Sequence, residues 1–495
     1  MLCGGQYLAQ SATASLSLSV TDEQGAIVPN AILKIKNGQT AFERIATTNA
    51  DGNFVFNQLS PTDYVLSVEA KGFAVYQSKI TLNVNDQSSL RIQLKVSGVG
   101  ATVDVTTNEL VTDSPAVSTL VDRQFIKNQP LNGRSFQNLV ELSPGVVITP
   151  SNLVNPGQFS VNGQRTSSNY LTVDGVSGNF GSVAATTPYE SLGGSVPSYS
   201  VLGTTASLAS VESVQEFSIQ TSTYAPEFGR QPGGQISLVT RSGTNRLTGS
   251  IYNYLRNDKL DANNWFANAN RLKRQPLRQN NFGAVVGGPV FLPKLYDGRD
   301  RTFFFFSYEG LRLRYPFVTE PLEVPSIAAR NNATGVLKEL LNAFPLPTGA
   351  PLVSNPNVAP YIANFTNPAK LDATSFRLDH QFNDRFSIFG RYNYSPSQDD
   401  QRARFCNTSC VGRLTSLSQT LTVGSTMIFS NSVSNDLRFN ISKSKSNQTY
   451  FIDTFGGAIV PSQAALYPSF TDGSRGYIYI AVNSSESNTL SDGLF

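Results

Sequence analysis

Side chains that perform catalysis or bind metal ions are scarce in this sequence. His380 is the single histidine among 495 residues, so no site can use two or three histidine ligands. A serine nucleophile in a strand-to-helix elbow would need a Gly-x-Ser-x-Gly motif, and the sequence contains none. The sequence therefore predicts a protein that is not an enzyme and that uses no metal ion or cofactor.

The cysteines favour a disulfide over a metal site. Cys406 and Cys410 lie four positions apart in a polar segment, which is typical of a small loop disulfide in an oxidising compartment. A metal site would need further ligands nearby, and that segment offers none. Cys3 lies in residues 1–14, which end in small residues and which we interpret as the remnant of a signal peptide or leader.

The composition narrows the class of protein further. A net charge of +3 on a chain of this size offers no basic patch for nucleic acid, so no such partner is expected. No stretch approaches 18 consecutive apolar residues, which excludes a transmembrane helix. Phe and Tyr are abundant, at 31 and 19 residues, whereas charged residues make up only 15% of the chain. This balance favours a β-rich protein and is compatible with a membrane barrel.

Residues 15–97 alternate between apolar and polar side chains with a period of two, as in Leu16, Leu18 and Val20. Turn signals such as Asp51-Gly52 separate the alternating runs. Seven short strands at this spacing predict a β-sandwich that is large enough to fold alone.

Several motifs in this zone resemble those of the carboxypeptidase-regulatory-like domain. They are Val20-Thr21-Asp22, Val28-Pro29-Asn30-Ala31, Asp51-Gly52-Asn53-Phe54, Leu59-Ser60-Pro61 and Ala70-Lys71-Gly72-Phe73. The sequence departs from the family at Ser19, where Gly is usual, and at Thr62-Asp63, where a Pro-Gly turn is usual. The resemblance implies a sandwich without peptidase activity, because a zinc peptidase needs histidine ligands and this zone has no histidine.

Residues 98–240 are rich in Gly, Asn, Ser and Pro, and their strand patterns are weaker. Short helices are predicted at 122–126 and 135–142, the second ended by Pro144-Gly145. Five motifs in this zone resemble the plug domain of TonB-dependent outer-membrane receptors. They are Pro130-Leu131-Asn132-Gly133-Arg134, Leu142-Ser143-Pro144-Gly145, Val161-Asn162-Gly163-Gln164-Arg165, Val173-Asp174-Gly175 and Val211-Glu212-Ser213-Val214-Gln215-Glu216-Phe217.

The charged residues of the plug motifs are candidate contacts with a barrel wall. Arg134, Arg165 and Asp174 would form ion pairs that break when the plug moves, or they are simply exposed charges on a polar domain. Asn162, Gly163 and Gly175 belong to the same motifs, and the glycines are expected to form turns.

A peptide that recruits TonB is expected between sandwich and plug, where it would pair with TonB as an added strand. The candidate is Thr102, Val103, Asp104, Val105 and Thr106, a β-prone segment flanked by glycines and polar residues. The alternative is that this segment is the last strand of the sandwich or a strand of the plug.

Residues 241–495 resemble the first part of the barrel of Oar-like TonB-dependent receptors. The junction motifs around Arg230 and Arg241 precede it, and both arginines are candidates for pairing with carboxylates of the lumen. The early strands carry Asn281-Phe282-Gly283-Ala284-Val285 and Arg301-Thr302-Phe303-Phe304-Phe305.

Alternation within this zone supports strands that cross a membrane. In 375–382 and 436–442 an apolar face alternates with a face of Arg, Asp, Gln or Asn, which cannot meet lipid and should line the lumen. A soluble sandwich, with the apolar face packed inward, would show the same pattern. Seven strands are predicted, at 246–257, 280–291, 301–312, 373–382, 385–395, 418–430 and 432–444.

The remaining segments are expected to be extracellular loops. Residues 313–372 are long and mostly unpatterned apart from a helix at 336–344, and the Cys406–Cys410 segment is polar. Seven strands cannot enclose a plug, because plugged transporters have barrels of about 22 strands. We therefore expect the chain to be the front part of a longer receptor.

The sequence thus predicts a mainly β chain with an N-terminal β-sandwich, a mixed α/β plug domain and a partial antiparallel transmembrane β-barrel. The resemblance implies a TonB-dependent receptor in a bacterial outer membrane, with the sandwich in the periplasm. It would pass a siderophore, an oligosaccharide or a protein by an energised movement of the plug. The expected partners are the TonB–ExbB–ExbD complex and outer-membrane lipid. The alternative is a secreted or cell-surface β-sandwich protein that mediates adhesion or binds carbohydrate.

Overall fold

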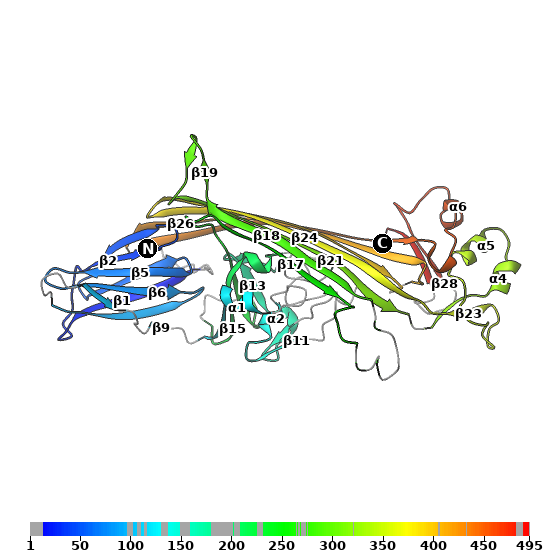
Figure 1. Ribbon diagram of the computed structural model, residues 1–495, viewed down its shortest axis with the longest axis horizontal. Coiled ribbons are helices and arrows are strands. Elements are labelled where there is room, and N and C mark those ends of the chain that lie inside the picture. The colour runs from blue at the N-terminus through cyan, green and yellow to red at the C-terminus, as the bar shows by residue number, and fades with distance from the viewer. Residues whose placement is uncertain are drawn as a thin grey trace, which may run out of the picture.

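The protein is a long sheet with a sandwich at one end, a plug beneath its hollow face and a cap of loops at the other end (Figure 1). None of the helices in the described residues is long and apolar enough to cross a membrane. The computed structural model describes residues 13–96, 102–105, 110–112, 116–129, 137–148, 159–179, 201, 208–224, 231–263, 265, 268, 274, 276–319, 321–403, 406–431, 433–481 and 489–494.

The sandwich consists of two sheets, with strand orders β4-β1-β7-β9 and β3-β2-β5-β6-β8. Their alternating apolar side chains form one core that includes Leu16, Leu33 and Phe56. The strands are β1 (Ala14–Asp22), β2 (Ile32–Lys36), β3 (Glu43–Thr47), β4 (Asn53–Leu59), β5 (Thr62–Glu69), β6 (Val75–Leu82), β7 (Gln87–Leu94), β8 (Thr102–Val105) and β9 (Val111–Thr112).

The sandwich extends further along the chain than the sequence predicted. β8 pairs with β6 and β9 pairs with β7, so the two sheets reach Thr112 and do not end at residue 97. Both added strands are short edge strands that follow glycine-rich or polar residues, and a pattern of two to four residues is too short to assign.

The plug is built on a five-stranded sheet of order β10-β15-β16-β13-β14. The two predicted helices are confirmed, although Asp122 caps the first helix and does not belong to it. The elements are β10 (Val117–Asp122), α1 (Arg123–Asn128), α2 (Gln137–Val140), β11 (Val146–Ile148), β12 (Phe159–Val161), η2 (Thr166–Ser168), β13 (Tyr170–Val173), β14 (Val176–Ser177), η4 (Val211–Ser213), β15 (Val214–Ser222) and β16 (Gln235–Thr240).

The third part is an open antiparallel sheet of order β17-β18-β21-β24-β25-β26-β27-β29-β28. All seven predicted strands are present, and most of them continue further toward the loop end. β28 and β29 are two strands that the sequence did not predict. The strands are β17 (Thr248–Asn257), β18 (Arg278–Pro289), β21 (Thr302–Val318), β24 (Asn364–Asn383), β25 (Phe386–Arg402), β26 (Cys410–Ser430), β27 (Val433–Ile452), β28 (Tyr477–Ala481) and β29 (Thr489–Leu494).

The two faces of this sheet have opposite chemistry. Phe376, Leu437 and Phe439 are exposed on the outer face, whereas Arg377 and Asn393 are withdrawn from water on the face toward the plug. A soluble sandwich would bury the apolar face, so the exposed apolar face supports strands that meet lipid.

The loop region is more ordered than the sequence predicted. Residues 313–372 were expected to be mostly unpatterned, but β21 continues to Val318 and β24 already begins at Asn364. Pro316 and Pro368 lie within these extended strands, and proline is a residue that sequence patterns assign to loops because it cannot donate a ladder hydrogen bond. Between them lie β22 (Leu322–Pro325), α4 (Ile327–Asn332), α5 (Gly335–Asn342) and β23 (Val358–Tyr361).

Candidate functional site

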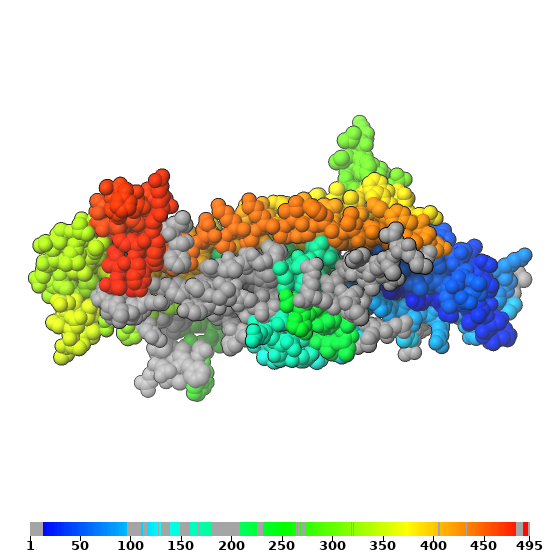
Figure 2. Space-filling view, turned by 180° about the vertical axis from the view of Figure 1, so that it is seen from behind, coloured from blue at the N-terminus to red at the C-terminus, as the bar shows by residue number. Residues whose placement is uncertain are grey.

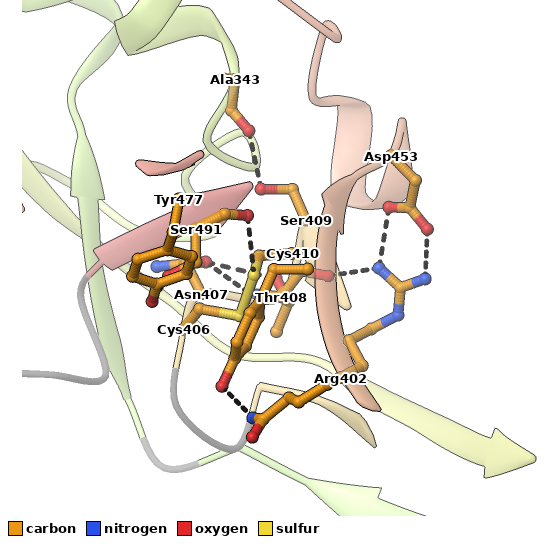
Figure 3. The surroundings of a disulfide bond; sticks show 12 residues. Ala343, Arg402, Cys406, Asn407, Thr408, Ser409, Cys410, Asp453, Tyr477 and Ser491 are labelled. Atoms are coloured by element: carbon orange, nitrogen blue, oxygen red, sulfur yellow. Dashed lines mark hydrogen bonds and ion pairs between the residues drawn. A yellow bond between two sulfur atoms is a disulfide. The ribbon is translucent and has the colours of Figure 1, made fainter. Parts of the chain in front are cut away.

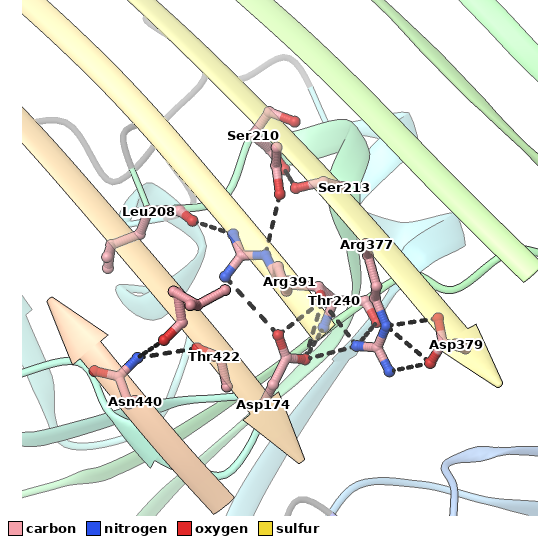
Figure 4. Close-up of polar contacts among 12 residues, drawn as sticks. Asp174, Leu208, Ser210, Ser213, Thr240, Arg377, Asp379, Arg391, Thr422 and Asn440 are labelled. Carbon is pink, nitrogen blue, oxygen red and sulfur yellow. Dashed lines mark hydrogen bonds and ion pairs between the residues drawn. The ribbon is translucent and has the colours of Figure 1, made fainter. Parts of the chain in front are cut away.

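The contact between the plug and the sheet centres on Asp174 (Figure 4). Asp174 and Gly175 both have positive φ angles, of 51° and 81°, and join β13 to β14 as a two-residue hairpin loop. This turn projects the Asp174 carboxylate toward the nine-stranded open sheet, which we call the wall. Only 3% of Asp174 is exposed there. Thr240, at the end of β16, fixes the carboxylate with its amide at 2.9 Å from Oδ1 and its hydroxyl at 2.8 Å from Oδ2.

Two arginines of the wall reach this carboxylate. Arg377 Nη1 of β24 lies 3.1 Å from Asp174 Oδ1, and Arg391 Nη1 of β25 lies 3.8 Å from Oδ2. Arg377 also donates to Asp379 of the same strand at 2.8 Å. The positive charge of Arg377 is therefore shared between a carboxylate of the plug and a carboxylate of the wall. Arg391 further donates to the backbone carbonyl of Leu208 in the plug and to Ser375 Oγ, the latter at 3.1 Å.

This arrangement can bind and orient the plug. We call these four residues the seat cluster: Asp174, Thr240, Arg377 and Arg391. Their side chains are oriented by hydrogen bonds and lie away from water. Breaking a buried ion pair by removing one partner typically destabilises a protein by about 3–5 kcal/mol, because the other charge is left uncompensated. The seat cluster can therefore hold the plug firmly while remaining able to separate into hydrated ions.

The other predicted plug residues lie outside the seat cluster. Asn162 and Gly163 form a turn after β12, and Asn162 Nδ2 donates to the Thr221 carbonyl at 2.8 Å within the plug. Arg165 is exposed at the start of η2. Arg134 and Arg230 lie outside the described residues.

Arg241 occupies the junction between plug and sheet. Its guanidinium lies over the Phe305 ring at 4.5 Å from the centroid, and Nη1 donates to the Glu212 carbonyl at 3.1 Å. Burial lowers the pKa of Arg241 to about 10, and the nearby Arg123 contributes to the shift. The structure thus shows a ring contact and a backbone contact for Arg241, and the nearby Glu212 carboxylate raises its pKa against these effects. Its pairing with a carboxylate of the lumen stays a prediction.

The TonB-binding candidate forms an edge strand of the sandwich. Thr102 to Val105 make up β8, which runs parallel to β6, with Val103 opposite Tyr76. Thr106 lies outside the described residues. The structure thus shows the alternative strand assignment for four of the five residues, and their role in binding TonB stays a prediction.

A second polar contact joins the sandwich to the plug. The Val84 amide, between β6 and β7, donates to Glu216 Oε1 of β15 at 2.5 Å. Burial raises the pKa of Glu216 to about 7, and the nearby carboxylates of Asp86 and Asp122 add to the shift. Sequence reasoning missed this contact, because its partners lie 132 positions apart and a backbone amide leaves no sequence signal.

At the loop end, Cys406 and Cys410 form a disulfide with the sulfur atoms 2.14 Å apart (Figure 3). Both cysteines are buried in a core with Phe344, Tyr467 and Leu490. Ser409 Oγ donates to the Ala343 carbonyl at 2.6 Å, and the Asn407 amide donates to the Thr489 carbonyl at 2.6 Å. The segment therefore ties β26, β29 and the end of α5 into one cap.

Within the described part of the chain, no group of three or more His, Cys, Asp and Glu side chains is placed to hold a metal ion. Thr240 and Arg391 are the members of the seat cluster that the sequence did not single out. In β25, the alternation of Arg391 and Asn393 with Tyr392 and Tyr394 was the available signal for the second of these residues.

Comparison with known proteins identifies two family models. An outer membrane beta barrel domain matches residues 239–337 and 326–493, which is just over half of the chain. A carboxypeptidase regulatory-like domain matches residues 15–95. Among curated proteins, the TonB-dependent transporter Oar of Myxococcus xanthus is 31% identical over 279 residues, covering 51% of this chain and 23% of that transporter.

Solved structures give a weaker likeness. The outer membrane transporter YddB from Escherichia coli matches with a TM-score of 0.47 and 13% identity, over 70% of this chain and 42% of that one. The siderophore receptor PiuA from Acinetobacter baumannii matches with a TM-score of 0.36 and 11% identity, over 72% of this chain and 50% of that one. The chain covers half or less of the length of each of these relatives.

Proposed function

The chain belongs to the outer membrane beta barrel domain family, and from this premise we propose that it takes part in TonB-dependent passage of a ligand across an outer membrane. A curated relative that is 31% identical over 279 residues is a TonB-dependent transporter, which supports the proposal. The chain also carries a plug sheet on the hollow face of the barrel strands (Figure 1).

The seat cluster is the observation that carries the proposal. A plug that only closed a pore could be packed with apolar side chains, whose separation would expose them to water. The contact found here is made by charged and hydroxyl groups, which water can solvate once the plug shifts. A pull on the chain before β10 would therefore open the lumen without exposing a large apolar surface.

We propose that β8 delivers this pull. One edge of β8 pairs with β6, so TonB would either add to the opposite edge or displace β6. The energy would come from the TonB–ExbB–ExbD complex of the inner membrane. The ligand, a siderophore, an oligosaccharide or a protein, would enter from the end that carries the disulfide cap.

The alternative, a secreted or cell-surface protein that mediates adhesion or binds carbohydrate, is not favoured. It requires a surface that is polar on the outside, and Ile251, Phe376 and Leu437 are exposed on the outer face of the sheet. The family membership also places the barrel strands in an outer membrane.

The test is binding of the purified periplasmic domain of TonB to the receptor in detergent. Val103→Pro and Val105→Pro should abolish binding, because proline removes the amide that a paired strand must donate. Val111→Pro in β9 is the matched control, since it also breaks an edge strand of the sandwich but lies outside the candidate. Binding that survives both β8 substitutions would refute the assignment of the peptide.

A further inference from the structure

A small hairpin projects from the outer side of the sheet, opposite the plug and near the sandwich (Figures 1 and 2). It consists of β19 (Phe291–Leu292) and β20 (Tyr296–Asp297), and it joins β18 to β21. Leu292 and Leu295 at its tip are exposed, with Leu295 at 81%, and so is Phe291 at its base. Exposed large apolar side chains gathered on one short element indicate a contact surface.

The hairpin is held firmly at its base. The Val290 amide donates to the Thr302 carbonyl at 2.8 Å, and the Gly298 amide donates to the Val290 carbonyl at 2.9 Å. A Cβ on Gly298 would lie 2.6 Å from the Val290 oxygen, so this close approach requires glycine. The apolar tip is therefore presented on a fixed support.

The charges of the hairpin are concentrated at its base. Arg299 pairs with Asp297, and Asp300 accepts a hydrogen bond from the Asn245 side chain at 2.5 Å. Lys294 is the one charged residue between Phe291 and Tyr296. Phe291 lies opposite Asp297, with the Arg299 guanidinium over its ring at 5.4 Å from the centroid. The tip beyond it thus combines Leu292 and Leu295 with a single cation.

The base is continuous with the outer, lipid-facing side of the barrel strands. The Tyr296 hydroxyl bonds to Thr302, whose hydroxyl lies 2.7 Å from His380 Nδ1. The His380 ring meets Phe382 edge-on at 4.3 Å, and Phe382 stacks on Phe386 at 4.7 Å. Aromatic rings at this position are typical of the membrane–water interface of barrel proteins.

We propose that the β19–β20 hairpin is an anchor in the lipid leaflet at the sandwich end of the barrel. Phe291, Leu292 and Leu295 lie at the boundary between headgroups and acyl chains, and the Lys294 ammonium lies at the lipid phosphates. Apolar side chains beside a lysine suit this boundary, because the apolar groups leave water while the long lysine stem keeps its charge at the headgroups. The anchor fixes the barrel against tilting at the end where the sandwich and plug are attached.

The test measures the depth of the tip in the receptor reconstituted in phospholipid vesicles. A bimane probe is attached at Leu295→Cys in a Cys3→Ser background, and quenching by nitroxide lipids is compared with quenching by a water-soluble nitroxide. Ile251→Cys, on the outer face of β17, is the membrane control, and Asp51→Cys, in an exposed turn of the sandwich, is the aqueous control.

The proposal predicts that a nitroxide near the headgroup quenches Leu295→Cys at least about twofold more than the water-soluble quencher does. In vesicles with anionic lipid, adding Lys294→Glu should shift the probe at Leu295→Cys toward water. The same substitution should leave the quenching of a probe at Asp51→Cys unchanged. If Leu295→Cys behaves like Asp51→Cys, the tip stands in water and the proposal is overturned in favour of a surface for a periplasmic protein. If Lys294→Glu leaves the depth unchanged, the role assigned to the ammonium is overturned.

Discussion

In the sandwich, Leu16, Leu33 and Phe56 are withdrawn from water against other apolar side chains, whereas in the seat cluster Asp174 is withdrawn from water against Arg377 and Thr240. Both places are dry, but they differ in what happens when they open. Opening the sandwich exposes apolar surface, while opening the seat cluster releases ions that water solvates well. This difference suits a domain that must stay folded beside a domain that must move.

The largest effect is expected in the sandwich core. Phe56→Ala removes a fully buried ring and should lower the free energy of unfolding of the sandwich by about 3–5 kcal/mol. Urea unfolding followed by tyrosine fluorescence measures the change. Val55→Ala, at an exposed neighbouring position, is the control and should change stability by less than about 1 kcal/mol. Equal effects of the two substitutions would refute the location of the core.

The seat cluster should respond to loss of its carboxylate. Asp174→Ala leaves the charges of Arg377 and Arg391 without their plug partner and should weaken docking of the plug by about 3 kcal/mol. Hydrogen exchange of β13 and β16 reports the docking, and exchange of β4 in the sandwich should not change. Arg165→Ala, at an exposed plug position, should leave the exchange of β13 unaltered.

Burial of Glu216 should make the stability of the folded plug depend on pH, although the hydrogen bond from the Val84 amide itself opposes the rise in the pKa of Glu216. The folded-state pKa of Glu216 is raised to about 7, so the stabilising contribution is complete below about pH 4.5 and is lost as the pH rises through 7. The resulting loss in the free energy of unfolding is at most about 3 kcal/mol, because each pKa unit between 4.5 and 7 corresponds to about 1.36 kcal/mol.

Glu216→Gln keeps an acceptor for the Val84 amide and removes the charge. At pH 8 this variant should protect that amide from exchange better than the native protein does, and at pH 5 the two should be alike. Glu23→Gln, on an exposed turn of the sandwich, is the control. Protection of the Val84 amide at pH 8 that is weaker in Glu216→Gln than in the native protein would contradict the assignment.

The smallest effect is expected at the loop cap. A disulfide between Cys406 and Cys410 closes a short loop, and replacing both by Ser should destabilise the cap by about 2 kcal/mol. Proteolysis of the loop end measures this loss. Exchange of β13 should not change, because the cap and the seat cluster share no residues. A simultaneous loosening of the plug would show that the two ends are coupled.

The sequence predicted those features whose signal is local. The alternation in 375–382 placed Arg377 on the polar face of a strand, and Asp174-Gly175 marked a tight turn with positive φ angles. The seven short strands of the sandwich and the first seven barrel strands follow from the same period of two. These features need only the residues beside them in the chain.

Features that depend on distant partners could not be predicted. Arg391 donates to the Leu208 carbonyl and Glu216 accepts from the Val84 amide, and backbone groups carry no side-chain signal. β8 is equally compatible with a free peptide and with an edge strand, because four β-prone residues do not distinguish them. Strands β28 and β29 were missed for a related reason, since β29 buries Thr489 and Ser491 as well as Leu490.

The most direct test of the seat cluster as the holder of the plug is to pull the plug from the barrel in a single-molecule experiment. The receptor is held in a bilayer, and a handle attached at Ala116→Cys, just before β10, is pulled from the sandwich side. β10 to β16 should release first while the barrel strands stay in place, and Asp174→Ala should lower the rupture force. Barrel strands that leave before the plug, or a rupture force that Asp174→Ala changes no more than Arg165→Ala does, would contradict this role of the seat cluster.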